Sequence, residues 1–492
     1  MGRRSCVYLL LLLSSCAFAT RKSGTAQAGY ESAATTLPVT TSSVVARKSF
    51  ERAMRNFEQY RLTETLRDLK EATKADPKFA QAYIMISKIS KDPVEQSTAC
   101  KRAKQLAPGA SSGERLLIRW LAGAQENDYL PAIAAMNDLL AQYPRDHRLA
   151  FLAGDWLTLQ QRYEQATVVL NHAVALLPDY PAALNDLGYT YAFSGDFEKA
   201  FATMERYIAL APDEPNPHDS YGEILRMAGK FEPAVEQYRM SIRMDPDFGS
   251  ELGVADTYAL MGKEQDARDE YERAMVFAST NYDKVYYELQ SAVTWVRENN
   301  RKQAEKALGE VAKHAHAAGL AQMEAEAHRV LAMYEPDPKA ALKHLQAAQN
   351  ALLEEHQISA SDRDEELARI LQVRATRLAE AQDMESAANT VNQLEAMVEL
   401  SRSQAIQVCY HAAAGAVLVA RGKYEEAIVH LEENSTDPSS MQLLWQAYQH
   451  TGAAAQAKAL AAKLSALNVP TVEQAMVVPQ FRASLVSQAA QP

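Results

Sequence analysis

The chain has 492 residues, 47% of them hydrophobic and 23% charged, a composition typical of a folded globular protein and not of a disordered or polytopic membrane chain. Its 51 Lys and Arg against 62 Asp and Glu give a formal charge of −11, which disfavours general nucleic-acid binding because such binding needs a basic surface. Four cysteines in a chain of this length exclude a disulfide framework.

Residues 1–19 have the pattern of a secretory signal peptide. Arg3 and Arg4 precede a short apolar run at residues 7–13, and small residues follow it. The run is too short to span about 30 Å of hydrocarbon, so we do not expect a transmembrane helix here. The pattern therefore predicts an exported protein.

Two cleavage sites fit the end of this signal. Residues 13–16, Leu-Ser-Ser-Cys, resemble the lipobox of bacterial lipoproteins, and this resemblance implies lipidation of Cys16. Residues 17–19, Ala-Phe-Ala, also fit ordinary signal peptidase, which would release a chain starting at Thr20. We favour the lipobox because the apolar run ends directly before it. The expected location is the periplasm, with contact to a membrane only through the lipid anchor.

Residues 20–46 are rich in Ser, Thr and Ala and have no helical stripe of apolar residues. This composition predicts a flexible tether between the anchor and the folded part of the chain.

Four columns of residues recur beyond the tether with a period of 34 residues. Between them, apolar residues follow helical spacing, which predicts pairs of helices. A glycine on the first helix and an alanine on the second allow the two axes to approach closely, and a proline ends each pair. The columns contain Pro144, Pro178, Pro212 and Pro246; Gly154, Gly188 and Gly222; Tyr163, Phe197 and Phe231; and Ala166, Ala200 and Ala234.

This pattern resembles the tetratricopeptide repeat family. Residues 184–212, LNDLGYTYAFSGDFEKAFATMERYIALAP, and residues 218–246 carry the family's order of Leu-Gly, Tyr, Ala, aromatic and Pro positions. Tyr207 and Ser241 depart from it, since the family usually has a second Ala there. The resemblance implies an all-α fold, an α-solenoid of antiparallel helix pairs wound into a TPR-like superhelix.

Outside the best-matching stretch, the period continues in a weaker form. The polar segment 359–366, SASDRDEE, is expected to be a long loop or a joint between two halves of the solenoid. We divide the folded part into degenerate helix pairs at 47–146, well-matched repeats at 147–281, degenerate helical repeats at 282–407, C-terminal TPR-like repeats at 408–470, and a tail at 471–492 that either caps the last repeat or is loose.

Motifs that carry enzyme chemistry are absent from the sequence. There is no phosphate-binding loop, HExxH, CxxC pair or GxSxG. His314 and His316 are two residues apart and would point to different faces of a helix, so we expect no metal site and no cofactor. Cys100 and Cys409 are predicted to be separate buried thiols. We therefore do not expect an enzyme.

The family resemblance implies that the first helices of successive repeats line a groove that binds a peptide or a partner helix. Acids outnumber bases in the corresponding columns, where Arg226 is the only cation, so a carboxylate ligand would be repelled. We therefore predict an apolar or basic partner segment, anchored by Tyr189 and Phe193. In the alternative, these side chains merely pack inside a tight superhelix or face water. The predicted groove consists of Phe151, Asp155, Leu159, Asn185, Tyr189, Phe193, Asp219, Glu223, Met227, Asp256 and Leu260.

The function that we expect from these features is a non-enzymatic protein-protein interaction scaffold in the bacterial cell envelope. Two alternatives stay open. One is an enzyme subunit, which would need a polar pocket with convergent titratable groups within residues 282–407. The other is a glycan-binding solenoid with Tyr and Trp platforms.

Overall fold

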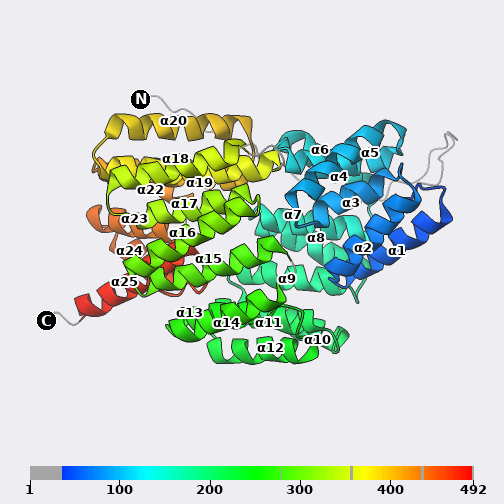
Figure 1. Cartoon of the computed structure of the whole chain (residues 1–492), viewed down its shortest axis with the longest axis horizontal. Helices are drawn as coiled ribbons and strands as arrows, with labels where there is room; N and C mark the ends of the chain where they lie inside the picture. The colour runs from blue at the N-terminus through cyan, green and yellow to red at the C-terminus, as the bar shows by residue number, and fades with distance from the viewer. Residues whose placement is uncertain (1–35, 279, 355–357, 434–436, 490–492) are drawn as a thin grey trace, which may run out of the picture. The chain divides into compact units, whose positions relative to one another are not determined.

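The computed structural model describes residues 36–278, 280–354, 358–433 and 437–489, and the regular elements in these ranges are helices (Figure 1). The all-α prediction is therefore confirmed. The first half of the array contains α1 (Val44–Glu58), α2 (Leu62–Ala75), α3 (Ala80–Ile89), α4 (Pro93–Leu106), α5 (Ser112–Gln125), α6 (Tyr129–Gln142), α7 (His147–Leu159), α8 (Tyr163–Leu176), α9 (Pro181–Phe193), α10 (Phe197–Leu210), α11 (Pro215–Met227) and α12 (Phe231–Met244), with a 3-10 turn at Ala107–Gly109.

The second half continues the same alternation to the end of the described residues. It contains α13 (Glu251–Leu260), α14 (Glu264–Phe277), α15 (Asn281–Arg297), α16 (Arg301–Ala317), α17 (Ala321–Tyr334), α18 (Pro338–Glu354), α19 (Ala360–Glu380), α20 (Met384–Leu400), α21 (Gln404–Ala420), α22 (Tyr424–Glu432), α23 (Pro438–His450), α24 (Ala454–Ser465) and α25 (Val472–Ala489).

Consecutive helices pack as antiparallel pairs, and the pairs stack as an α-solenoid. Each odd-numbered helix contacts the even-numbered helix that follows it. From α7 to α23, each odd-numbered helix also contacts the next odd-numbered one. The odd-numbered helices from α7 to α23 therefore form one continuous surface, which we call the odd-helix face. None of the described helices is both long and apolar enough to span a bilayer.

The repeated glycines lie where two helices touch, as the sequence predicts. A Cβ atom on Gly154 would come within 2.4 Å of Leu170, and one on Gly188 would come within 2.1 Å of Met204. Gly195 has a different role, because its φ of 81° turns the chain between α9 and α10 in a conformation that L side chains rarely adopt. The alanines of the second helices, Ala166, Ala200 and Ala234, are fully buried.

The predicted tether, residues 20–46, extends too far toward the C-terminus, because residues from 37 onward belong to the folded part. Leu37 donates its backbone N–H to Asp146 at 2.8 Å, and the Thr41 hydroxyl donates to Asp76 at 2.5 Å. Helix α1 then begins at Val44 with Ser43 as its N-cap. Residues 37–43 are therefore anchored to the helix pairs because their polar groups find partners there. The signal segment, Cys16 and most of the tether lie outside the described residues.

The polar segment 359–366 is the first part of α19, so the predicted loop is wrong. The Ser359 hydroxyl accepts the backbone N–H of Asp362 at 3.0 Å and caps the helix. Asp362 also places negative charge in the first turn, where the helix dipole favours it. A cap followed by acids is thus a helix start, although its composition is that of a loop.

Cys100 and Cys409 are unbridged and buried, as predicted. Burial raises the pKa of the Cys100 thiol to about 11 and that of the Cys409 thiol to about 12, so both are protonated at neutral pH.

Candidate functional site

Four of the residues predicted to line the groove lie in the core instead. Phe151 is 2% exposed, and its ring packs 5.4 Å from that of Tyr180. Asn185, Asp256 and Leu260 are also buried. These side chains fill the spaces between successive helix pairs, so a partner cannot reach them and the predicted groove is corrected at these positions.

A fifth position, Asp155 on α7, contacts another helix pair. Lys88 of α3 forms an ion pair with its carboxylate at 2.7 Å. Burial lowers the pKa of the Lys88 ammonium, but the charge of Asp155 outweighs this and raises the pKa overall. The negative charge of Asp155 is therefore neutralised within the chain and is not offered to a ligand.

Arg226 of α11 holds the centre of a polar cluster on the odd-helix face. Its guanidinium donates to Asp256 at 2.9 Å and to Glu223 at 3.0 Å. The hydroxyl of Tyr271 donates to Asp256 at 2.6 Å, and that of Tyr189 donates to Glu223 at 2.8 Å. Burial raises the pKa of Asp256 in spite of its charged partner. Arg226 is only 3% exposed and so stabilises the fold instead of facing solvent.

Asp219, also on α11, accepts a hydrogen bond from the Ser250 hydroxyl at 2.6 Å. Burial raises its pKa to about 6, so its carboxylate is mostly ionised at neutral pH. Around Arg226 the acids Asp219, Glu223 and Asp256 outnumber Arg226 and Arg297, the second of which also interacts with Asp256, and this part of the odd-helix face keeps an excess of negative charge.

Two of the remaining predicted positions are exposed apolar side chains. Phe193 is 46% exposed and Leu159 is 63% exposed. The ring of Phe193 stacks on Tyr163 with 5.7 Å between centroids and on Tyr189 with 6.1 Å. Leu159, Phe193 and the half-buried Met227 are the last residues of α7, α9 and α11. We call Leu159, Tyr163, Tyr189 and Phe193 the Phe193 surface.

Lys88 and Tyr163 are neighbours of this site that the sequence analysis did not assign to it. Tyr163 belongs to the column of aromatic residues that come just before the alanines of the 34-residue repeat. Its position next to Phe193 therefore follows from the repeat. Lys88 lies 67 positions before Asp155 and outside the well-matched repeats, and no local pattern pairs the two.

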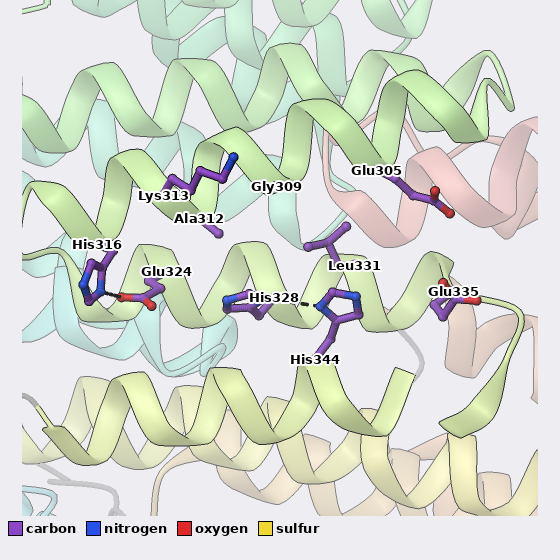
Figure 2. A pocket seen from close by; sticks show the side chains of 10 residues that line it. All are labelled: Glu305, Gly309, Ala312, Lys313, His316, Glu324, His328, Leu331, Glu335 and His344. Atoms are coloured by element: carbon purple, nitrogen blue, oxygen red, sulfur yellow. Dashed lines mark hydrogen bonds and ion pairs between the residues drawn. The ribbon is translucent and has the colours of Figure 1, made fainter. Parts of the chain in front are cut away.

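A groove of about 660 Å³ lies between α16, α17 and α18 (Figure 2). It falls within residues 282–407, where the alternative of an enzyme subunit requires a polar pocket. His316 pairs with Glu324 at 3.0 Å, and the Nδ1 atoms of His328 and His344 are 3.4 Å apart. The two pairs stand apart along the groove in Figure 2. Among the described residues, no three His, Cys, Asp or Glu side chains are grouped to hold a metal ion.

We expect the His328–His344 pair to make the chain less stable in acid. Burial, followed by the neighbouring His344 ring, lowers the pKa of His328. Below about pH 6.5 the unfolded chain therefore binds a proton that the folded chain binds only at lower pH, and stability present above that pH is lost as the pH falls. His328→Gln should reduce the loss of unfolding free energy between pH 7.5 and 5.

Urea denaturation at each pH measures this effect. Identical pH dependence in His328→Gln and the wild type would show that the pair does not couple folding to protons.

Comparison with known proteins gives one family match. Residues 157–224 match the model of the tetratricopeptide repeat family. The chain matches no curated protein. The matched residues run from the end of α7 to α11 and include Tyr163, Tyr189 and Phe193 of the Phe193 surface.

Solved structures similar to the chain have low identity. The Cut9–Hcn1 hetero-tetramer of the APC/C is 16% identical over 84% of this chain and 78% of that chain, with a TM-score of 0.41. Yeast Tom70 is 13% identical over 85% of this chain and 96% of that one, with a TM-score of 0.40. A tetratricopeptide repeat protein from Parabacteroides merdae is 13% identical over 62% and 99%, with a TM-score of 0.35.

Proposed function

We propose that this chain, which carries tetratricopeptide repeats at residues 157–224, is a non-enzymatic scaffold that binds an apolar or basic segment of a partner protein at the Phe193 surface. Proteins with such repeats generally mediate protein-protein interactions. The observation that carries the proposal is the exposed ring of Phe193, stacked between Tyr163 and Tyr189 and close to the negative cluster around Arg226.

The rings suit a binding site because they are already ordered. Stacking holds Tyr163, Tyr189 and Phe193 in place, so binding costs little side-chain entropy, and aromatic residues commonly dominate binding energy. Tyr189 connects the rings to the acids through its hydrogen bond with Glu223. A basic residue of the partner would find the excess negative charge there, whereas a terminal carboxylate would be repelled.

Phe193→Ser should weaken binding of a preferred peptide by about 2 kcal/mol, roughly 30-fold in Kd. A peptide array probed with the full-length chain identifies the preferred sequences, and fluorescence titration then measures their affinities. Val168→Ser is the matched control, since Val168 is 65% exposed on the even-numbered helix α8 and lies outside the Phe193 surface.

The proposal requires that apolar or basic peptides bind the wild type and Val168→Ser with equal affinity. The same peptides should bind Phe193→Ser with lower affinity. A preference for acidic C-termini, or equal affinity of all three chains, would refute it.

We also propose that the scaffold is exported and held at a membrane of the bacterial envelope by a lipid on Cys16. This rests on the sequence of residues 1–19 and on the acidic charge of −11, which offers no general attraction to anionic lipid. Cys16→Ser should move the chain from the membrane fraction to the soluble fraction. If the variant remains fully in the membrane fraction, a lipid on Cys16 is not what holds it there.

A further inference from the structure

Two histidines face each other across the helix pair of α21 and α22. The Nδ1 atom of His411, on α21, lies 3.2 Å from that of His430, on α22. The centres of the two imidazole rings are 5.2 Å apart, and their planes meet at 45°. Both side chains are half-buried, so the pair is part of the helix contact and is still open to solvent on one side.

These distances fit two imidazoles that share one metal ion. Zn²⁺ binds histidine nitrogens at about 2.0–2.1 Å in a tetrahedral arrangement, which puts two such nitrogens about 3.3 Å apart and their ring centres about 5.2 Å apart. The His411–His430 pair agrees with both values. Without an ion, one ring donates its Nδ1–H to the other. When an ion binds, that proton moves to Nε2 of the same ring, and both Nδ1 lone pairs become ligands.

The pair formed by His328 and His344 fits this geometry less well. Its Nδ1 atoms are 3.4 Å apart, but its ring centres are 5.7 Å apart, so the two rings do not converge on one ion as closely. The groove beside it is also lined by Lys313, whose charge repels a cation. Two neighbouring imidazoles are therefore not sufficient, and the rings of His411 and His430 are the ones that converge.

Tyr410, on α21, packs against both converging rings. Its ring meets that of His411 edge-on with 5.0 Å between centroids, and that of His430 edge-on with 5.7 Å. Contacts of this kind fix the direction of a ligand's lone pair before the ion arrives. The two Nδ1 atoms are therefore already placed, and an ion can bind without a rearrangement of α21 and α22.

The charges around the pair favour a cation. Burial lowers the pKa of His411 and His430, so both rings are mainly uncharged at neutral pH, as metal ligands must be. The exposed carboxylates of Glu395 on α20 and Glu433 after α22 act against this shift, because they favour positive charge near the rings. Neutral ligands beside two acids attract a metal ion more than they attract an anion.

We infer that His411 and His430 form a binding site for a divalent transition-metal ion of the Zn²⁺ type, with their two Nδ1 atoms as ligands. Among the described residues no third His, Cys, Asp or Glu side chain is grouped with them, so water completes the coordination. The ion joins α21 to α22 and stabilises the folded chain. The sequence does not predict this site, because the two histidines are 19 positions apart and belong to no metal motif. It shares no residue with the Phe193 surface, so either site can fail without the other.

Isothermal titration calorimetry with zinc chloride tests the inference on the full-length chain, purified without a polyhistidine tag. We expect the wild type to bind Zn²⁺ and His411→Gln to bind it at least tenfold more weakly, because imidazole suits this ion and a glutamine amide does not. His328→Gln, which removes one ring of the other pair, is the matched control and should bind Zn²⁺ as the wild type does. Magnesium chloride should not replace zinc, since Mg²⁺ prefers oxygen ligands.

Thermal denaturation provides a second readout. An ion that binds only the folded chain raises the midpoint of unfolding, so zinc should raise it in the wild type and in His328→Gln but not in His411→Gln. Glu395→Gln should keep this shift but need severalfold more zinc to reach it, because only the attraction of the carboxylate is lost. Equal zinc affinity of the wild type and a folded His411→Gln chain would overturn the inference, and so would an equal loss in His328→Gln.

Discussion

Arg226→Met should destabilise the chain by about 3–5 kcal/mol, because the substitution leaves the carboxylate of Asp256 buried without its cation. The pair is almost fully enclosed, with side-chain exposures of 4% for Arg226 and 7% for Asp256. Methionine fills a similar volume, so most of the cost is the unpaired charge. Chemical denaturation measures the free energy of unfolding, and near-ultraviolet circular dichroism reports packing around Tyr271 and its neighbours.

Arg301→Met is the control for an exposed ion pair. Arg301 and Glu305 are 44% and 42% exposed, so this substitution should destabilise the chain far less than Arg226→Met does. Adding Asp256→Asn to Arg226→Met should recover part of the stability, since the second change removes the buried charge and keeps an acceptor for Tyr271. Equal effects of Arg226→Met and Arg301→Met would contradict the central position of Arg226 in the cluster.

Gly253→Ala should cost about 2–3 kcal/mol although alanine is the better helix former. A Cβ atom at this position would lie 2.1 Å from Cε1 of the Tyr238 ring, which is 2% exposed. The ring cannot retreat easily, because its other contacts include Gly222, where a Cβ would also meet it at 3.0 Å. The clash therefore forces α12 and α13 apart.

Gly309→Ala makes the same change where the space is open. Gly309 lies inside α16, and a Cβ there would meet nothing within 4 Å. We expect this variant to gain up to about 1 kcal/mol from helix propensity. The two substitutions should thus shift the denaturation midpoint in opposite directions. Shifts in the same direction would show that close contact between helices is not the reason for glycine at position 253.

The helix pairs could be predicted from the sequence because the residues that determine each pair lie within one repeat. Gly154, Gly188 and the buried alanines lie where the spacing places them, since a helix pair needs small residues at its crossing. Phe193 and Leu159 are exposed near helix ends, as a groove residue should be. The prediction failed for Ser359, because a helix cap and a polar loop have similar compositions.

Contacts between distant helix pairs could not be predicted from the repeat. Helix α1 contacts α9, and the hydroxyl of Tyr60 donates to Asp186 at 2.8 Å across 126 positions. Such contacts involve Asp155 and leave only part of the predicted groove open. They depend on how successive pairs rotate relative to one another, and the 34-residue pattern does not encode that rotation. The contact of α25 with α15 is another long-range contact that the repeat does not predict.

Site-specific photocrosslinking tests the central claim that the Phe193 surface binds a partner protein. A photoreactive phenylalanine analogue replaces Phe193 in the full-length chain in cells, and a second chain carries it at Val168. The account predicts one dominant crosslinked protein at position 193, attached through an apolar or basic segment that mass spectrometry identifies, and little product at position 168. Equal products at both positions, or a crosslinked segment rich in acidic residues, would contradict it.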